Sequence, residues 1–289
     1  MLARQKSGGV ICYACNKLVS VDAQTCIHCG VSNPGLWGYA RTLRRLGYDS
    51  GFTSIVVWGC IGLYLLTLAD GFESGGNFEL LSPKCRSLFI AGAAGGVTVL
   101  EYGRWWSLLS SGWLHGDLFH IAFNMLWISR LAPSVTKAYG SARLNIIYTL
   151  SIISGGLLTV LVFKYIPNQG SWLTIGASGG VFGLFGALVS YGQRMKDYAI
   201  KQSAIIYAVI GFAFGFVTPN VNNWGHLGGF LGGYLFTKTP WLDAKKSQKV
   251  HDVLIAIACF GLVIICVLFS VLDSIRLLYA GGVFPKSCS

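Results

Sequence analysis

Charged residues are scarce in this chain: Asp, Glu, Lys and Arg together make up 11% of its 289 residues. Ordinary soluble domains carry about a quarter charged residues. Hydrophobic residues make up 53%, and the mean hydropathy is +0.58. This balance excludes an ordinary soluble domain and indicates an integral membrane protein. The first ten residues also lack an apolar core, so a secretory signal peptide is not expected.

Long uncharged stretches take the place of the missing charge. The clearest covers residues 253–272, twenty residues without a charge, and 52–69 is nearly as apolar. Five weaker stretches contain glycine or polar residues: 114–131, 144–163, 173–191, 204–217 and 221–236. The sequence therefore predicts an all-α polytopic membrane protein with seven spanning helices.

The few charges are mostly basic, with 22 Lys and Arg against 11 Asp and Glu. With a cytoplasmic N-terminus, most basic residues fall on the inside, which is the usual bias of membrane proteins. They are Arg41, Arg44, Arg45, Arg130, Lys137, Arg143, Arg194, Lys196, Lys201, Lys238, Lys245, Lys246 and Lys249. The net charge of +11 is thus a topology signal and an attraction to membrane lipid, and no nucleic-acid partner is expected. Because no organelle presequence precedes the first motif, we expect a multi-pass protein of the bacterial cytoplasmic membrane.

Two polar motifs interrupt the apolar stretches. Ser178 stands in Gly176-Ala177-Ser178-Gly179, and His226 stands in Trp224-Gly225-His226-Leu227-Gly228-Gly229. A hydroxyl and an imidazole at membrane depth are costly unless they pair or line a wet cavity, so they are candidates for function. The predicted topology runs both helices inward from the outer face, with Ser178 roughly 8 Å below the helix start and His226 level with it. This arrangement indicates a nucleophile and a base for hydrolysis within the bilayer.

Glycines spaced four apart accompany both motifs. They are Gly179 and Gly183 on one helix, and Gly225, Gly229 and Gly233 on the other. Each set forms a smooth stripe that lets two helices approach closely. Such stripes are also common in membrane packing that has no catalytic role.

Hydrogen-bond donors cluster on the stretch 114–131. His120 and Asn124 lie four residues apart, on one helical face, and His115 stands at the helix entrance. An amide and an imidazole are suitable donors for the oxyanion that develops during acyl transfer. The alternative interpretation is that they tie membrane helices together by hydrogen bonds.

Taken together, these motifs resemble those of the rhomboid intramembrane serine proteases, over residues 105–234. The matching elements are G-x-S-G at Gly176 to Gly179, H-x-x-G-x-x-x-G at His226, Gly229 and Gly233, and His115 with His120-x-x-x-Asn124. The resemblance implies a six-helix catalytic core, here followed by a seventh helix. It also implies intramembrane cleavage of membrane-spanning substrates near the outer face, with a preference for small residues at the cut.

The resemblance implies a dyad without a third member. Ser178 attacks the scissile carbonyl, and His226 takes the proton and returns it to the leaving amine. Phe182, one turn after the serine, is expected to stack on His226. His120, Asn124 and the backbone N–H of Ser178 are expected to hold the oxyanion, with His115 in a supporting hydrogen-bond role. No cofactor is implied for catalysis.

One departure from the family pattern concerns the first external loop, residues 70–116. The family has Trp-Arg where this chain has Trp106-Ser107. Glu101 and Arg104 could form a substitute pair that orders the loop. An apolar stretch at 90–100 is expected to lie in the outer leaflet.

A separate module opens the chain. Its pattern is C-x2-C, ten residues, then C-x2-C, with cysteines at Cys12, Cys15, Cys26 and Cys29. This spacing predicts a structural zinc ribbon in which His28 is a bystander. A pair of disulfides is the alternative, which a reducing cytoplasm disfavours. The expected role of this module is to bind a cytoplasmic protein partner or to regulate the protein.

The chain thus divides into a zinc ribbon (1–32), a basic amphipathic linker (33–51), a rhomboid core (52–240) and a final segment (241–289). Within the linker, residues 36–47 could form a helix on the membrane surface or a solvated, packed helix. Cys60, Cys259 and Cys266 are expected to be buried, small apolar residues. Cys85 and Cys288 both face outside in this topology, where a disulfide between them could form.

Two other functions remain open for the core. The first is a non-catalytic rhomboid-like protein that binds membrane clients, which the intact Ser178 and His226 disfavour. The second is a channel or transporter. Internal repeats or an intramembrane carboxylate would be expected for that function, and the sequence shows neither.

Overall fold

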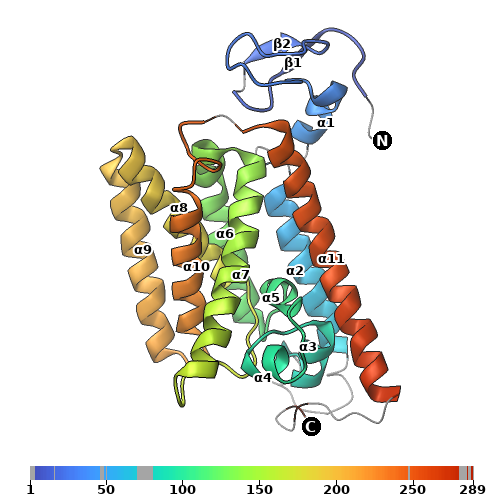
Figure 1. Cartoon of the computed structure of the whole chain (residues 1–289), viewed down its shortest axis with the longest axis vertical. Coiled ribbons are helices and arrows are strands. Elements are labelled where there is room, and N and C mark those ends of the chain that lie inside the picture. Colours follow the sequence, from blue (N-terminus) through green and yellow to red (C-terminus); the bar gives the residue numbers. More distant parts are fainter. Residues whose placement is uncertain are drawn as a thin grey trace.

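A bundle of long helices forms the body of the protein, with a small two-stranded module beyond one end (Figure 1). The computed structural model describes residues 4–15, 17–45, 49, 51–69, 81–246, 248–279, 285 and 288. The long helices among these residues are α2 (Phe52–Leu68), α6 (Leu118–Tyr139), α7 (Ser141–Tyr165), α8 (Ser178–Met195), α9 (Tyr198–Val217), α10 (Asn223–Phe236) and α11 (Val250–Tyr279). Each corresponds to one of the seven predicted stretches.

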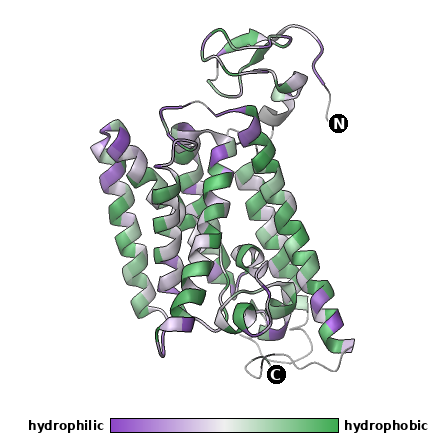
Figure 2. Ribbon diagram, in the orientation of Figure 1, coloured by the Kyte–Doolittle hydropathy of each residue, from purple (hydrophilic) through white to green (hydrophobic). Residues whose placement is uncertain are grey.

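The long helices differ in length and in how apolar they are. Within the described residues, α7, α9 and α11 are long and apolar enough to cross a membrane, and α2 is apolar but shorter. Hydrophobic residues continue along most of the bundle's length in α9 and α11 (Figure 2). The shorter or more polar helices α8 and α10 carry many of the glycines and pack against each other and against α7. Polar and glycine-rich segments are tolerated at membrane depth because neighbouring helices bury them.

Short helices order the loop between α2 and α6: α3 (Cys85–Ala91), α4 (Gly96–Leu100), α5 (Ser107–Ser110) and the 3-10 turn η4 (Ser111–Trp113). The apolar stretch 90–100 therefore folds against the bundle, and Ala94 pairs with Thr174 in an isolated antiparallel bridge. This bridge joins the loop to the segment that precedes α8.

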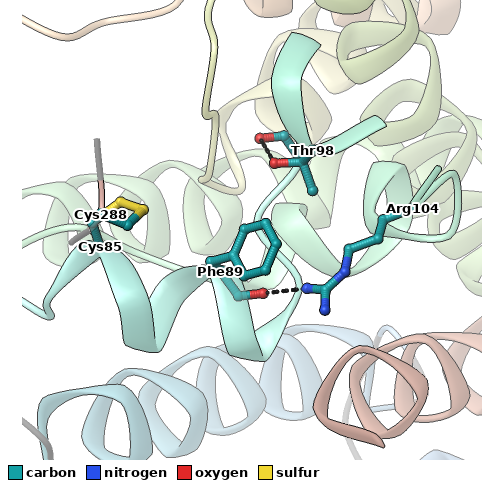
Figure 3. The surroundings of a disulfide bond; sticks show 6 residues. Cys85, Phe89, Thr98, Arg104 and Cys288 are labelled. Carbon is teal, nitrogen blue, oxygen red and sulfur yellow. Dashed lines mark hydrogen bonds between the residues drawn. A yellow bond between two sulfur atoms is a disulfide. The ribbon is translucent and has the colours of Figure 1, made fainter. Parts of the chain in front are cut away.

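Arg104 anchors this loop to the seventh helix. Its fully buried guanidinium donates to Asp273 Oδ2 at 2.9 Å and to Ser274 Oγ at 2.8 Å. It also donates to the Phe89 carbonyl at 2.9 Å (Figure 3). Glu101 is exposed, so the predicted Glu101–Arg104 pair is wrong and Asp273 is the acidic partner. Trp106 Nε1 adds a hydrogen bond to Ser270 Oγ at 2.9 Å. The sequence analysis missed these partners because they lie about 170 residues away on α11.

The N-terminal module is a small hairpin, β1 (Gly9–Ile11) paired antiparallel with β2 (Leu18–Ser20). Its hydrophobic cluster comprises Val10, Cys12, Val19, Val21, Cys26, Val31, Leu36 and Ala40. The first part of the predicted linker thus packs into the ribbon, through the turn η1 (Leu36–Gly38) and the short helix α1 (Ala40–Arg45). Of the predicted linker helix, residues 46 and 47 lie outside the described residues.

The remaining cysteines follow the expectation of burial, with one addition. Cys60 and Cys259 are buried and Cys266 is half-buried. Cys85, at the start of α3, forms a disulfide with Cys288, 203 residues later, which the sequence had left open (Figure 3). The helix α3, which begins at Cys85, lies at the end of the bundle opposite the ribbon (Figure 1).

Candidate active site

Ser178 is the first residue of α8, not a residue within its first turns. The predicted start at residue 173 is wrong for two reasons. Thr174 exchanges backbone hydrogen bonds with Ala94 at 2.7 and 3.0 Å, and Gly176 has a φ of +119°, which does not fit a helix. The N–H groups of the first helical turn have no partner within the helix, so the backbone N–H of Ser178 is among the free donors at its positive end.

Gly176 brings His120 of α6 next to Ser178. A methyl group built on Gly176 would lie 2.6 Å from His120 Nε2 and 3.7 Å from Ser178 Oγ. Only glycine leaves room for the imidazole there while adopting the positive φ. The nonhelical segment before α8 lies close to the residues that lead into α6, since a methyl group built on Gly116 would lie 3.3 Å from Ile175 Cδ1.

His226 lies over the beginning of α8. Its ring stacks on Phe182, with centroids 4.2 Å apart and planes inclined by 10°. Phe182 follows Ser178 by one turn of α8, and His226 is the fourth residue of α10, so both motifs lie near helix starts. The imidazole is buried, and its Nδ1 has no hydrogen-bond partner among the described residues. The stacked ring is therefore what orients His226.

No hydrogen bond joins Ser178 to His226 in the described part of the chain. Hydrogen bonds between catalytic groups are often long in the absence of substrate and shorten in the complex.

Glycine contacts fix the separation of α8 and α10. A methyl group on Gly229 would overlap the Gly179 carbonyl oxygen, and one on Gly233 would overlap the Gly183 carbonyl oxygen. The helices are thus in backbone contact along the predicted stripes. This backbone contact fixes the position of His226 on α10 relative to Ser178 on α8, along the helix axes.

His120 and Asn124 lie on α6, one turn apart. The His120 Nδ1 accepts a long hydrogen bond from the Gly116 N–H at 3.4 Å. In a neutral imidazole the other nitrogen then carries the proton, so Nε2 is a donor beside Gly176. Asn124 is buried and donates one amide N–H to the His120 carbonyl at 2.9 Å. The second N–H of the same amide group is a further donor.

His115 lies just before α6, in the loop that ends at the N-cap Asp117. It is fully buried, and its ring contacts His120 edge to face with centroids 5.0 Å apart. Neither ring nitrogen has a partner among the described residues. It supports the His120 ring by packing.

Two capping residues were missed by the sequence analysis. Asp117 accepts from the His120 N–H and caps α6. Asn222 caps α10 by accepting from the Gly225 N–H at 3.0 Å, and it donates to Thr159 Oγ1 at 2.8 Å and Thr174 Oγ1 at 2.9 Å. An Asp or Asn just before an apolar stretch is a recognisable N-cap signal. Asn222 therefore ties the start of α10 to α7 and to the segment before Ser178.

The four ribbon cysteines form a second candidate site. Their sulfur atoms lie within 4.8 Å of one another, with Cys12–Cys29 at 3.9 Å and Cys15–Cys26 at 3.7 Å. Tetrahedral zinc with Zn–S bonds of about 2.3 Å places its sulfurs about 3.8 Å apart, so the arrangement fits a metal ion. The cluster does not include the exposed His28.

The ribbon also stabilises a thiolate. Burial raises the pKa of the Cys26 thiol, but hydrogen bonds from the backbone N–H groups of His28 and Cys29 and from neighbouring thiols outweigh it, lowering the pKa to about 7. A thiolate is the form that binds metal.

The sequence is similar to that of known proteins. The Rhomboid domain matches residues 102–241. Rhomboid protease GluP of Bacillus subtilis is 34% identical over 140 residues, covering 47% of this chain and 26% of GluP. Putative rhomboid protease YdcA, also of Bacillus subtilis, is 33% identical over 150 residues, covering 51% of this chain and 71% of YdcA. Inactive RHOMBOID-like protein 8 of Arabidopsis thaliana is 30% identical over 165 residues, covering 55% of this chain and 45% of that protein.

The similarity spans about a quarter of GluP but more than two thirds of YdcA. The residues that the Rhomboid domain matches, 102–241, contain the G-x-S-G segment, the His226 motif and the donors of α6. On these grounds the chain belongs to the rhomboid family.

Proposed function

We propose that this protein is an intramembrane serine endopeptidase in which Ser178 is the nucleophile and His226 is the general base. The observation that carries the proposal is the stack of Phe182 on His226, one helical turn from Ser178. It holds an imidazole over the start of α8 with no carboxylate to orient it.

In the proposed reaction, Ser178 Oγ attacks the scissile carbonyl while His226 takes its proton. The tetrahedral oxyanion accepts hydrogen bonds from the Ser178 N–H, His120 Nε2 and the free N–H of Asn124. His226 then protonates the leaving amine, which leaves an acyl-enzyme on Ser178. Water, deprotonated by His226, hydrolyses this ester and regenerates the serine.

The proposed site opens near the outer face of a bacterial cytoplasmic membrane. Ser178 lies beside the Ala94–Thr174 bridge, at the end of the bundle that carries the disulfide. Disulfides persist in oxidising compartments, whereas a cluster of free cysteines suits a reducing one. The ribbon and the N-terminus are therefore assigned to the cytoplasm, where most Lys and Arg also fall. The substrates are membrane-spanning helices with small residues near the cut.

The ribbon is assigned a structural zinc ion held by Cys12, Cys15, Cys26 and Cys29. The close spacing of the four sulfur atoms supports binding of the metal. The ion is assigned a structural role because a closed four-cysteine site has no open position for catalysis. Its exposed surface is available to a cytoplasmic protein partner.

Purified, detergent-solubilised protein tests the proposal on a reporter with a single spanning helix. The intact chain should cut the reporter, and Ser178→Ala and His226→Ala should each abolish the product. The similarity to an inactive relative favours a second candidate, a client-binding protein without proteolysis. Reporter binding without any product, across several reporters, would support that candidate instead.

A further inference from the structure

The ribbon contacts the bundle through its first cysteine loop. Tyr13 stands between the ligands Cys12 and Cys15, and its carbonyl accepts a hydrogen bond from Gln248 Nε2 at 2.7 Å. Gln248 is buried, and its Oε1 accepts from the Ala142 N–H at 3.2 Å. One amide side chain therefore joins the metal-binding loop to the start of α7.

Apolar contacts extend this interface. Val250 and Val253, on the first turn of α11, pack against the hydrophobic cluster of the ribbon, which includes Cys12 and Cys26. Tyr13 is half-buried here, and its hydroxyl has no partner among the described residues.

A buried ion pair lies next to this contact. Arg143 of α7 donates to Asp252 of α11 at 3.0 Å, and neither side chain is more than 2% exposed. Asp252 also accepts from Trp241 Nε1 at 2.7 Å and from the Lys249 N–H at 2.8 Å. Buried pairs are stable only while both charges keep their partners. The residues that contact the ribbon, Gln248, Val250 and Val253, lie on either side of Asp252 in the sequence.

The docking loop is also the metal-binding loop. Two of the eight residues of the ribbon's hydrophobic cluster are the ligands Cys12 and Cys26. A core this small does not hold a fold without a metal or a disulfide, and metal-binding free energy then becomes folding free energy. The position of the Tyr13 carbonyl therefore depends on the four sulfurs being drawn together.

We propose that the four-cysteine site is a metal-dependent docking site within this chain: the metal-bound ribbon docks on Gln248 and the first turn of α11, and loss of metal releases it. The docked ribbon clamps the cytoplasmic ends of α7 and α11 together. This inference is independent of whether the core hydrolyses peptides.

Hydrogen exchange on the full chain in detergent tests the docking. Zinc is first loaded to one ion per chain and is then removed with a chelator. Removal should speed exchange about ten-fold or more in residues 250–256 and 141–145, and leave α8 unchanged. Protection of 250–256 that survives complete loss of zinc would overturn the proposal. Equal acceleration in α8 would also overturn it, because the metal would then support the whole fold.

Two variants separate docking from metal binding. Gln248→Ala should keep one zinc per chain and still accelerate exchange in residues 250–256 several-fold. His28→Ala, on the exposed part of the second cysteine loop, is the matched control and should keep both zinc and protection. Full protection in Gln248→Ala would contradict the proposed contact.

Discussion

Arg104 of the loop between α2 and α6 and Asp273 of α11 form an ion pair at 2.9 Å in which the arginine is completely buried. Ser107 follows Trp106 in this chain, and the ion pair is made by Arg104, three residues before Ser107. The seventh helix is therefore structurally coupled to the loop that leads into the candidate active site. The family's six-helix core does not supply this partner.

Asp273→Ala should destabilise the protein by about 3 kcal/mol, because it leaves Arg104 buried without a counter-charge. Thermal unfolding in detergent measures the loss, and reporter cleavage should fall with it as the loop loosens. Glu101→Ala removes an exposed carboxylate of the same loop and serves as the control. Equal stability of the two variants would show that the pair does not anchor the loop.

Gly176→Ala should reduce cleavage by about 100-fold or more, since the new methyl group would displace His120 from the candidate oxyanion site. Alanine is also strained at a φ of +119°. The rate of reporter cleavage and the melting temperature are measured together. Gly62→Ala on α2, where a methyl group meets no atom within 4 Å, should leave both unchanged. Normal cleavage by Gly176→Ala would remove His120 from the site.

Phe182→Ala should lower kcat/KM about ten-fold, because a stacked aromatic pair contributes about 1 kcal/mol beyond its buried area. The orientation of His226 would be lost while the chemical groups remain. Phe182→Tyr keeps the ring and should retain most of the activity. If both variants cleaved the reporter as fast as the parent chain, stacking would not be what orients the base.

Asn222→Ala should cost about 2 kcal/mol, from the lost N-cap of α10 and the lost hydrogen bonds to Thr159 and Thr174. Because the start of α10 positions His226, kcat should fall more than KM rises. Asn222→Asp keeps the capping acceptor and should recover most of the rate. A uniform rise in KM, with kcat unchanged, would argue against a positioning role.

The helices of the fold could be predicted because each carries its own signal. Apolar runs locate α2 and α11 to within a few residues at their starts. The end of α11 was set too early, at residue 272, because Asp273 interrupts the apolar run. In fact Ser270, Asp273 and Ser274 lie three and four residues apart on one face of the helix, which is a readable sign that this face packs against polar groups.

The start of α8 could not be predicted in the same way. No charged residue or proline separates residues 173–177 from the helix, so the sequence does not mark where the helix begins. The nonhelical conformation before α8 depends on the bridge from Thr174 to Ala94, 80 residues earlier. Such pairing leaves no local pattern. For the same reason the sequence could name Ser178 and His120 as candidates, but not the contact through Gly176 that places them together.

The disulfide between Cys85 and Cys288 joins a residue between the first and second long helices, α2 and α6, to one that follows the seventh, α11. On the proposed topology, Cys85 reaches the outer compartment once the first helix has crossed the membrane, but Cys288 reaches it only after the seventh has crossed. The bond can therefore close only on a fully inserted chain. The fraction of cross-linked protein would then report how many chains have inserted all seven helices, which gives a direct assay of membrane assembly that needs no substrate.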